Sequence, residues 1–247
     1  MQQDITVILN CFKRPQYLKE QIESVQQQTK KPKEIIIWVN DSQENRKLRF
    51  ENLGDDIKIV RSNHNWSFFG RFTIALLAKS KYIALYDDDT IPGRRWHENC
   101  LNTMKMHEGI LGGVGIRIAN DGKYNSLPKY GWPVSNEKTV EVDLVGHAWF
   151  FKKEWTKYLW YEEPYTYDNG EDMHFSYTAQ KYGNIKTYVP PHKKDLKETH
   201  SSIKGVVYGG DSVASHKNRV SIFYEQRDKC VEHNQKNGWK LYKDKND

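Results

Sequence analysis

Cysteine is scarce in this sequence, and its spacing fits neither a metal site nor a disulfide framework. Cys11, Cys100 and Cys230 are the three cysteines among 247 residues, and no Cys-x-x-Cys pair is present. An odd number of widely separated thiols argues against a disulfide-bonded scaffold and against a structural zinc site. It is typical of a protein kept in a reducing compartment.

Long apolar runs are absent as well. No stretch approaches the roughly 20 apolar residues that a membrane-spanning helix needs, and the mean hydropathy is -0.86. The N-terminus, Met1-Gln2-Gln3-Asp4, lacks the basic flank and the apolar core of a secretory signal. These absences exclude an integral membrane protein, and we expect a cytoplasmic location.

Glycine-rich phosphate loops are missing where they would be needed. The loop after the first predicted strand, Asn10-Cys11-Phe12-Lys13-Arg14-Pro15, contains no glycine, which argues against a nucleotidyltransferase. No P-loop is present, and Gly112-Gly113-Val114-Gly115 matches a dinucleotide fingerprint only weakly. The pairs His97-Glu98 and His107-Glu108 both lack the second histidine of a zinc protease.

Basic residues outnumber acidic ones by 38 to 32, which gives a formal net charge of +6. This excess suits acidic partners, namely nucleotide diphosphates, anionic membrane surfaces or nucleic acid. Lysines and arginines are interspersed with acids, however, which favours a solvated basic surface. We therefore predict no nucleic-acid partner and leave a peripheral membrane contact open.

Apolar runs alternate with helical patterns in the first half of the chain. Ile5–Leu9 and Glu34–Val39 are predicted strands, and Pro15–Gln28 is a predicted helix between them. Such a unit predicts two parallel strands with a right-handed crossover. Further strands are expected at 57–60 and from 82, and further helices at 71–78 and from 96. The predicted class is α/β, with a mostly parallel sheet flanked by helices.

The second half changes character but shows no repeat and no low-complexity linker. We predict a single domain over residues 1–247. The expected strands are 111–119, 139–145, 148–151 and 185–189, the expected helices are 171–182 and 219–237, and residues 192–216 form a polar, mobile loop.

The most informative motif is a run of three acids, Asp87-Asp88-Asp89, directly after the apolar strand that starts at Tyr82. Like charges so close together raise one another's pKa, and folding does not require them. A hard divalent cation would relieve the repulsion. Because ligands bind at the carboxyl ends of strands in open α/β sheets, the triplet predicts an anionic ligand held with a metal. The alternative is a solvated acidic turn.

Polar residues also follow the other strands of the first half. They are Lys13-Arg14-Pro15, Asn40-Asp41-Ser42 and Arg61-Ser62-Asn63, and Arg71 starts a helix. Each set alone is ordinary turn, cap or surface chemistry. Because the carboxyl ends of parallel strands share one edge, the sets together predict a nucleotide site.

With the acidic triplet, these segments resemble a glycosyltransferase of the GT-A fold, and family-2-like and exostosin-like enzymes have the most similar patterns. The apolar strand in Gly146–Trp155 and the helix start Asn169-Gly170-Glu171-Asp172-Met173 agree with this. The resemblance covers residues 4–190. It implies the GT-A (nucleotide-diphospho-sugar transferase) fold, with residues 1–110 binding the nucleotide sugar and residues 111–247 binding the acceptor.

The resemblance also implies donor and metal contacts. Asp41 would bond the nucleobase, and Asp89 would ligate the metal with Asp87. A C-terminal histidine often completes such a site, and His216 is our choice over His192 and His200, although each is also an ordinary surface residue. The other residues expected against the base, ribose or diphosphate are Arg14, Pro15, Arg61, Asn63, Arg71, Asp87 and Asp88.

The expected catalytic residues are Asp172 and Glu171. Mn²⁺ or Mg²⁺ would stabilise the negative charge left on the departing diphosphate. In an inverting reaction a carboxylate takes the acceptor's proton, and Asp172 at a helix start suits that role. The alternative is that both acids compensate the helix dipole. The aromatic runs Tyr158–Tyr161 and Tyr165–Tyr167 form either an acceptor platform or ordinary packing.

We therefore predict a metal-dependent glycosyltransferase that uses a UDP- or GDP-sugar and a carbohydrate acceptor. Inversion and retention stay open. The alternatives are a nucleotidyltransferase and a non-catalytic module that binds carbohydrate or nucleic acid, which would not explain both acidic sites. Residues 192–216 are predicted to act as a lid over the diphosphate, and the alternative is a disordered surface loop.

Overall fold

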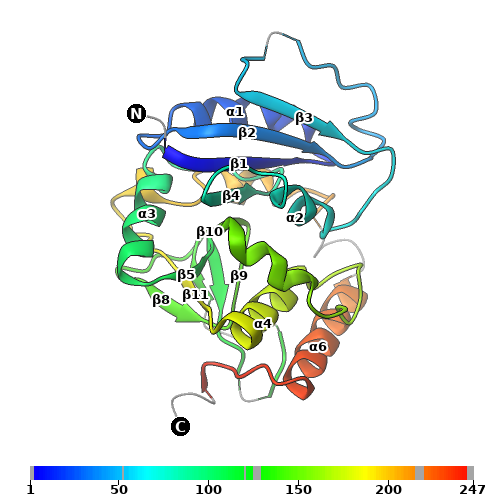
Figure 1. The fold of residues 1–247 in the computed structure, drawn as a ribbon, viewed down its shortest axis with the longest axis vertical. Coiled ribbons are helices and arrows are strands. Elements are labelled where there is room, and N and C mark those ends of the chain that lie inside the picture. Colours follow the sequence, from blue (N-terminus) through cyan, green and yellow to red (C-terminus); the bar gives the residue numbers. More distant parts are fainter. Residues whose placement is uncertain (1–2, 52, 120, 125–128, 215–219, 244–247) are drawn as a thin grey trace.

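The computed structural model describes residues 3–51, 53–119, 121–124, 129–214 and 220–243 (Figure 1). Its largest element is an eight-stranded sheet in the order β3-β2-β1-β4-β10-β5-β11-β8, and a three-stranded sheet has the order β7-β6-β9. Among the described residues, no helix combines the length and the apolar character that crossing a membrane requires.

The first half builds the parallel part of the large sheet. Strand β1 (Gln3–Cys11) lies between β2 (Pro32–Val39) and β4 (Tyr82–Tyr86), and β3 (Ile57–Arg61) pairs with β2, all in parallel. Residues of β1 on both faces are fully buried, as a parallel strand covered by helices requires. The predicted strand–helix–strand unit is confirmed.

Beyond β4 the sheet becomes mixed. Strand β10 (Ala148–Lys152) pairs antiparallel with β4 and with β5 (Gly109–Leu111). Strand β11 (Lys186–Val189) is parallel to β5, and β8 (Val140–Val142) is antiparallel to β11. As a result β10 starts at the edge where β4 ends, so the second half supplies backbone to the same edge.

The predicted strands 111–119 and 139–145 each divide between the two sheets. Strand β6 (Val114–Ile116) pairs with β7 (Lys129–Gly131) and β9 (Leu144–Gly146) in the small sheet. The chain leaves β5 through Gly112, where a Cβ would lie 2.3 Å from Cβ of Val145. Only a glycine allows this close approach.

Helices surround the large sheet (Figure 1). Helix α4 (Glu171–Gly183) packs against α6 (Val220–Lys236), and side chains of both form a second core that also holds Trp239 and Leu241. The predicted loop 192–216 contains two helical turns, so the prediction of a loop without secondary structure is wrong there. The helices are η1 (Pro15–Tyr17), α1 (Leu18–Gln26), α2 (Gly70–Ala75), α3 (Trp96–Met106), η2 (Lys153–Trp160), α4 (Glu171–Gly183), η3 (Lys197–Thr199), α5 (Gly205–Tyr208) and α6 (Val220–Lys236).

Candidate active site

The acidic triplet lies at the carboxyl end of β4, beside the turn that joins β9 to β10. The backbone N–H of Asp87 donates to the carbonyl of His147 at 3.2 Å. His147 has φ of 68°, a left-handed conformation that is uncommon for a residue with a side chain and often marks functional sites. The turn is therefore held in a conformation that brings an imidazole to the acids.

Asp87, Asp89 and His147 form a cluster that could hold a metal ion. One ligand atom from each lies within 4.8 Å of the others. Burial raises the pKa of Asp87 to about 7, the Arg71 guanidinium opposes this rise, and Asp89 adds to it. Burial lowers the pKa of His147, which favours the neutral imidazole that metals bind. Two carboxylates and an imidazole are chemically suited to a divalent cation.

The predicted histidine ligand was a different one. His216 lies outside the described residues. His192 is buried and interacts with the Pro190 carbonyl and the Ser201 hydroxyl, and His200 interacts with the Lys193 carbonyl, so both face backbone or hydroxyl groups. Sequence reasoning missed His147. Its signal was a polar residue interrupting the apolar run between β9 and β10.

Arg14 binds the other side of the triplet. Its side chain forms ion pairs with Asp88 at 2.9 Å and Asp89 at 3.5 Å. The backbone N–H of Lys13 donates to Asp88 at 3.1 Å. Arg14 also pairs with Asp211 at 2.7 Å, which ties the segment after α5 to the site. The Asp88 carboxylate therefore binds Arg14 and the backbone of the loop after β1.

Arg71 joins the triplet to the predicted catalytic acids. It is 4% exposed and forms ion pairs with Asp87 and, at 2.7 Å, with Glu171. Burial raises the pKa of Glu171 to about 7, and the adjacent Asp172 raises it further, against the effect of Arg71. Within the described part of the chain, Oε2 of Glu171 is buried without a hydrogen-bond partner. A buried acid with a free oxygen is suited to an incoming hydroxyl or cation.

Asp172 stands one residue further along α4. It is 7% exposed, and Arg227 from α6 forms an ion pair with it. A Cβ built on Gly146 would lie 3.9 Å from Oδ2 of Asp172, so this carboxylate faces the turn that carries His147. The structure thus brings Asp172 to the edge that carries the metal cluster. Sequence reasoning missed Arg227, which lies in a helix that no motif singled out.

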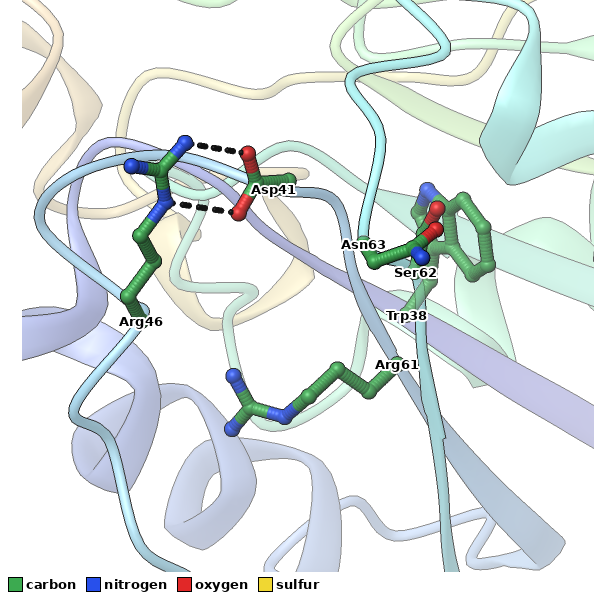
Figure 2. Close-up of a pocket in the computed structure, with 6 residues that line it drawn as sticks. All are labelled: Trp38, Asp41, Arg46, Arg61, Ser62 and Asn63. Carbon is green, nitrogen blue, oxygen red and sulfur yellow. Dashed lines mark hydrogen bonds and ion pairs between the residues drawn. The ribbon is translucent and has the colours of Figure 1, made fainter.

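Three of the residues predicted to contact the nucleotide, Asp41, Arg61 and Asn63, line an open cavity of about 670 Å³ at the ends of β2 and β3. Figure 2 shows Asp41 and Arg46 facing each other, with Arg61 below them and Trp38 beside Asn63. Arg46 binds both oxygens of Asp41, at 3.0 and 2.7 Å. These hydrogen bonds lower the pKa of Asp41, which therefore stays an acceptor at neutral pH.

Arg61 and Pro15 have additional structural roles. The Arg61 guanidinium donates to the carbonyls of Asn45 at 3.1 Å and Leu48 at 2.9 Å, which fixes the loop opposite Trp38. Pro15 begins the 3₁₀ turn η1 and is not among the residues that line the cavity. Pro15 therefore shapes the loop that presents Arg14.

Comparisons with known proteins identify the family and the fold of this chain. A family model described as glycosyl transferase family 2 matches residues 6–160. The crystal structure of S. aureus TarS 1-349 is 19% identical in sequence with a TM-score of 0.52, and the match covers 78% of this chain and 59% of that chain. A comparison with curated protein sequences finds no match.

The same TarS fragment has been solved with two ligands. Its complex with UDP is 17% identical with a TM-score of 0.53, covering 78% of this chain and 59% of that one. Its complex with UDP-GlcNAc is 17% identical with a TM-score of 0.52, covering 78% and 57%. This chain thus spans less than two thirds of the TarS chains, and the likeness shows a shared fold.

Proposed function

This chain belongs to glycosyl transferase family 2 and has the GT-A fold that its sequence predicts, and from this premise we propose that it transfers a sugar from a uridine diphosphate sugar to a carbohydrate acceptor. The observation that carries the proposal is the meeting of three groups at one sheet edge. They are the cavity at Asp41, the cluster of Asp87, Asp89 and His147, and the acids Glu171 and Asp172.

A divalent cation is part of the proposal. Asp87, Asp89 and His147 would hold it, since their ligand atoms converge within 4.8 Å. When bound, Mn²⁺ or Mg²⁺ supplies a Lewis acid that stabilises the diphosphate leaving group. Arg14 lies against Asp89 and has the forked geometry that binds phosphate, so it adds a second positive group beside the departing diphosphate.

The cavity at Asp41 would receive the nucleobase. Asp41 accepts hydrogen bonds, Arg46 donates them, and Trp38 also lines the cavity, beside Asn63. Uracil presents an N–H between two carbonyls, which matches an acceptor next to a donor. The UDP and UDP-GlcNAc complexes of TarS support uridine over the GDP-sugars that the sequence also allowed.

The acids at the start of α4 would act on the acceptor. Asp172 takes the proton of the acceptor hydroxyl as its oxygen bonds to C1 of the sugar. The bond between C1 and the β-phosphate oxygen breaks, and UDP leaves with its electron pair. Glu171, held by Arg71, lies beside Asp172 and would orient the acceptor through its free oxygen.

The testing experiment is a panel of UDP- and GDP-sugars with Mn²⁺, in which release of free nucleotide is measured with water as acceptor. We expect at least one UDP-sugar to be hydrolysed slowly, EDTA to stop the release, and Asp89→Asn to reduce it at least about 100-fold, as loss of charge stabilisation at a leaving group does. The exposed Asp55 supplies the control variant Asp55→Asn, which should behave as wild type.

A non-catalytic binding module is the rival. It would bind a sugar or a nucleotide and never release free diphosphate. Equal nucleotide release with and without EDTA would contradict the role of the metal. If no donor released nucleotide, the proposal that this chain is a transferase would be contradicted.

A further inference from the structure

Helix α6 binds the start of α4 through its side chains, although α6 lies beyond the part of the chain that the family model matches. Arg227 of α6 donates from Nη1 to Oδ1 of Asn169 at 2.9 Å and from Nη2 to Oδ2 of Asp172. Arg227 is 4% exposed, so this pair is shielded from water. One guanidinium therefore binds both the turn before α4 and the predicted base.

A second residue of α6 fixes the same turn by contact. Gly170 has φ of 82°, and a Cβ there would lie only 2.6 Å from Sγ of Cys230. Cys230 stands three residues after Arg227, on the same face of the helix. The two residues act differently, because Cys230 contributes packing without charge. Cys230 thus offers a matched structural control for Arg227.

These contacts give the Asp172 side chain one orientation. Its Oδ1 accepts the backbone N–H of Met173 at 2.8 Å, and its Oδ2 bonds to Arg227 on the side that faces Gly146. The next residue, His147, belongs to the metal cluster. The ring of Tyr124 lies 3.8 Å from Cζ of Arg227 and helps to exclude water.

A buried ion pair adds little net stability, because the cost of removing both charges from water offsets most of their attraction. The start of α4 needs only a neutral cap, which a short polar side chain would provide. Here an arginine is buried instead, and its Nε has no hydrogen-bond partner among the described residues. The burial of the Arg227 charge is therefore better explained by its effect on the Asp172 side chain than by a contribution to the stability of the fold.

We propose that Arg227 is a positioning residue of glycosyl transfer, which holds the Asp172 carboxylate in one orientation beside the turn that carries His147 of the candidate metal cluster. This inference rests on the proposed function, in which Asp172 takes the acceptor's proton. Arg227 touches neither donor nor acceptor in this scheme and acts through Asp172 alone.

Charges of both signs surround Asp172. Glu171 stands beside it on the same helix, and Arg227 from α6 and Arg71 from α2 supply positive charge. Arg227 is the one of these arginines that bonds to Asp172 directly. Without Arg227 the carboxylate should lose its fixed orientation, which should slow transfer and leave donor binding unchanged.

The test compares Arg227→Met, Arg227→Lys and Cys230→Ala on the donor that the panel identifies, beginning with UDP-GlcNAc and Mn²⁺. The rate of nucleotide release gives kcat and KM, and UDP binding is measured by calorimetry. We expect Arg227→Met to lower kcat about 100-fold and to leave KM and UDP affinity unchanged. Arg227→Lys should restore part of kcat, and Cys230→Ala should keep the wild-type kcat.

Folding of Arg227→Met is checked by its midpoint of urea unfolding. The double variant Arg227→Met/Asp172→Asn should recover part of any loss of stability, since it removes the unpaired charge. If Arg227→Met keeps the wild-type kcat, or if Arg227→Lys loses as much kcat as Arg227→Met, Arg227 is structural and the inference is overturned. A panel in which no donor is cleaved by the wild type overturns the proposed function first, and the role of Arg227 with it.

Discussion

At the scale of single residues, the site is a set of carboxylates held by three buried arginines. Arg14 binds Asp88 and Asp89, Arg71 binds Asp87 and Glu171, and Arg227 binds Asp172. Each arginine comes from a different part of the chain. The acids therefore keep fixed positions despite their mutual repulsion, and a cation that enters meets a prearranged site.

Asp41 is the residue we expect to matter most for the nucleobase. Its oxygens point at Arg46 within the cavity, so a base that enters can exchange with this ion pair. Asp41→Ala should weaken UDP binding about tenfold, the usual scale for a hydrogen bond to a charged group, and leave thermal stability within about 1 °C. Calorimetry with UDP and Mn²⁺ measures this. The exposed Arg49 provides the control Arg49→Ala, and an unchanged affinity in Asp41→Ala would place the base elsewhere.

His97 gives a pH dependence of stability. It is fully buried between the Tyr86 hydroxyl, at 2.8 Å, and the Lys30 carbonyl, at 2.9 Å, and burial lowers its pKa to about 4. The unfolded chain protonates near pH 6.5 and the folded one does not, so this contribution is complete above pH 6.5 and is lost as pH falls toward 4. The slope is about 1.4 kcal/mol per pH unit for one proton.

The variant His97→Gln removes this titration. Urea unfolding of both proteins between pH 7 and 4.5 should show a shallower loss of the free energy of unfolding in the variant. Some slope should remain, because burial lowers the pKa of His192 to about 4 as well. Parallel curves for the two proteins would contradict the assignment to His97.

At the scale of elements, the parallel strands were predictable and the mixed part of the sheet was not. The continuous apolar runs of β1, β2 and β4 are typical of strands buried on both faces. The run in β10 has the same composition, yet it is antiparallel to both neighbours. Composition does not encode strand direction, because buried side chains on either kind of strand meet the same surroundings.

The segment from α5 to Asp211 is the element we expect to move with the donor. Tyr208 stacks on Tyr17 with ring centroids 3.8 Å apart, Lys204 pairs with Glu20, and Asp211 pairs with Arg14. A Cβ on Gly209 would lie 2.7 Å from Oδ2 of Asp89, so this segment already borders the metal cluster.

Amide exchange tests this lid. UDP with Mn²⁺ should slow exchange in residues 204–211 more than UDP alone does, because a diphosphate bound at the cluster also contacts Arg14 and the adjoining backbone. Residues of α3 serve as an internal reference that should not change. If exchange in 204–211 stays the same while calorimetry shows saturation, these residues form no lid.

At the scale of the whole molecule, two hydrophobic cores support the elements that carry the site. The first lies along the large sheet, and the second joins α4, α6, the small sheet and Trp239. Since α4 and α6 carry Asp172 and Arg227, the second core positions the acids that we propose to be catalytic. Loosening it should therefore affect transfer as well as stability.

Trp239→Ala tests whether the two cores fold as one unit, as the prediction of a single domain requires. Trp239 is 3% exposed, and its truncation should lower the free energy of unfolding by about 3–5 kcal/mol. Circular dichroism and fluorescence should still report one coincident transition in urea. The exposed Trp66 gives the control Trp66→Ala, which should change stability by about 0.5 kcal/mol or less. Two separate transitions would divide the chain into two domains.

The sequence by itself determined the fold class and most of the residues at the donor edge. Apolar runs that end in polar residues identify strand ends, and parallel strand ends share an edge whatever the details of packing. By that logic Arg71 and the acidic triplet meet, as the ion pair between Arg71 and Asp87 shows, and Asp41 lies in a cavity with Arg61 from the end of the next strand.

Only the tertiary structure decided which residues complete the site. His147 and Arg227 lie far from the triplet in sequence, and neither stands in a motif with a fixed spacing. They reach the acids because β10 reverses direction beside β4 and because α6 packs on α4. Long-range packing sets both contacts, and the local pattern of residues around a histidine or an arginine does not record which distant surface it will meet.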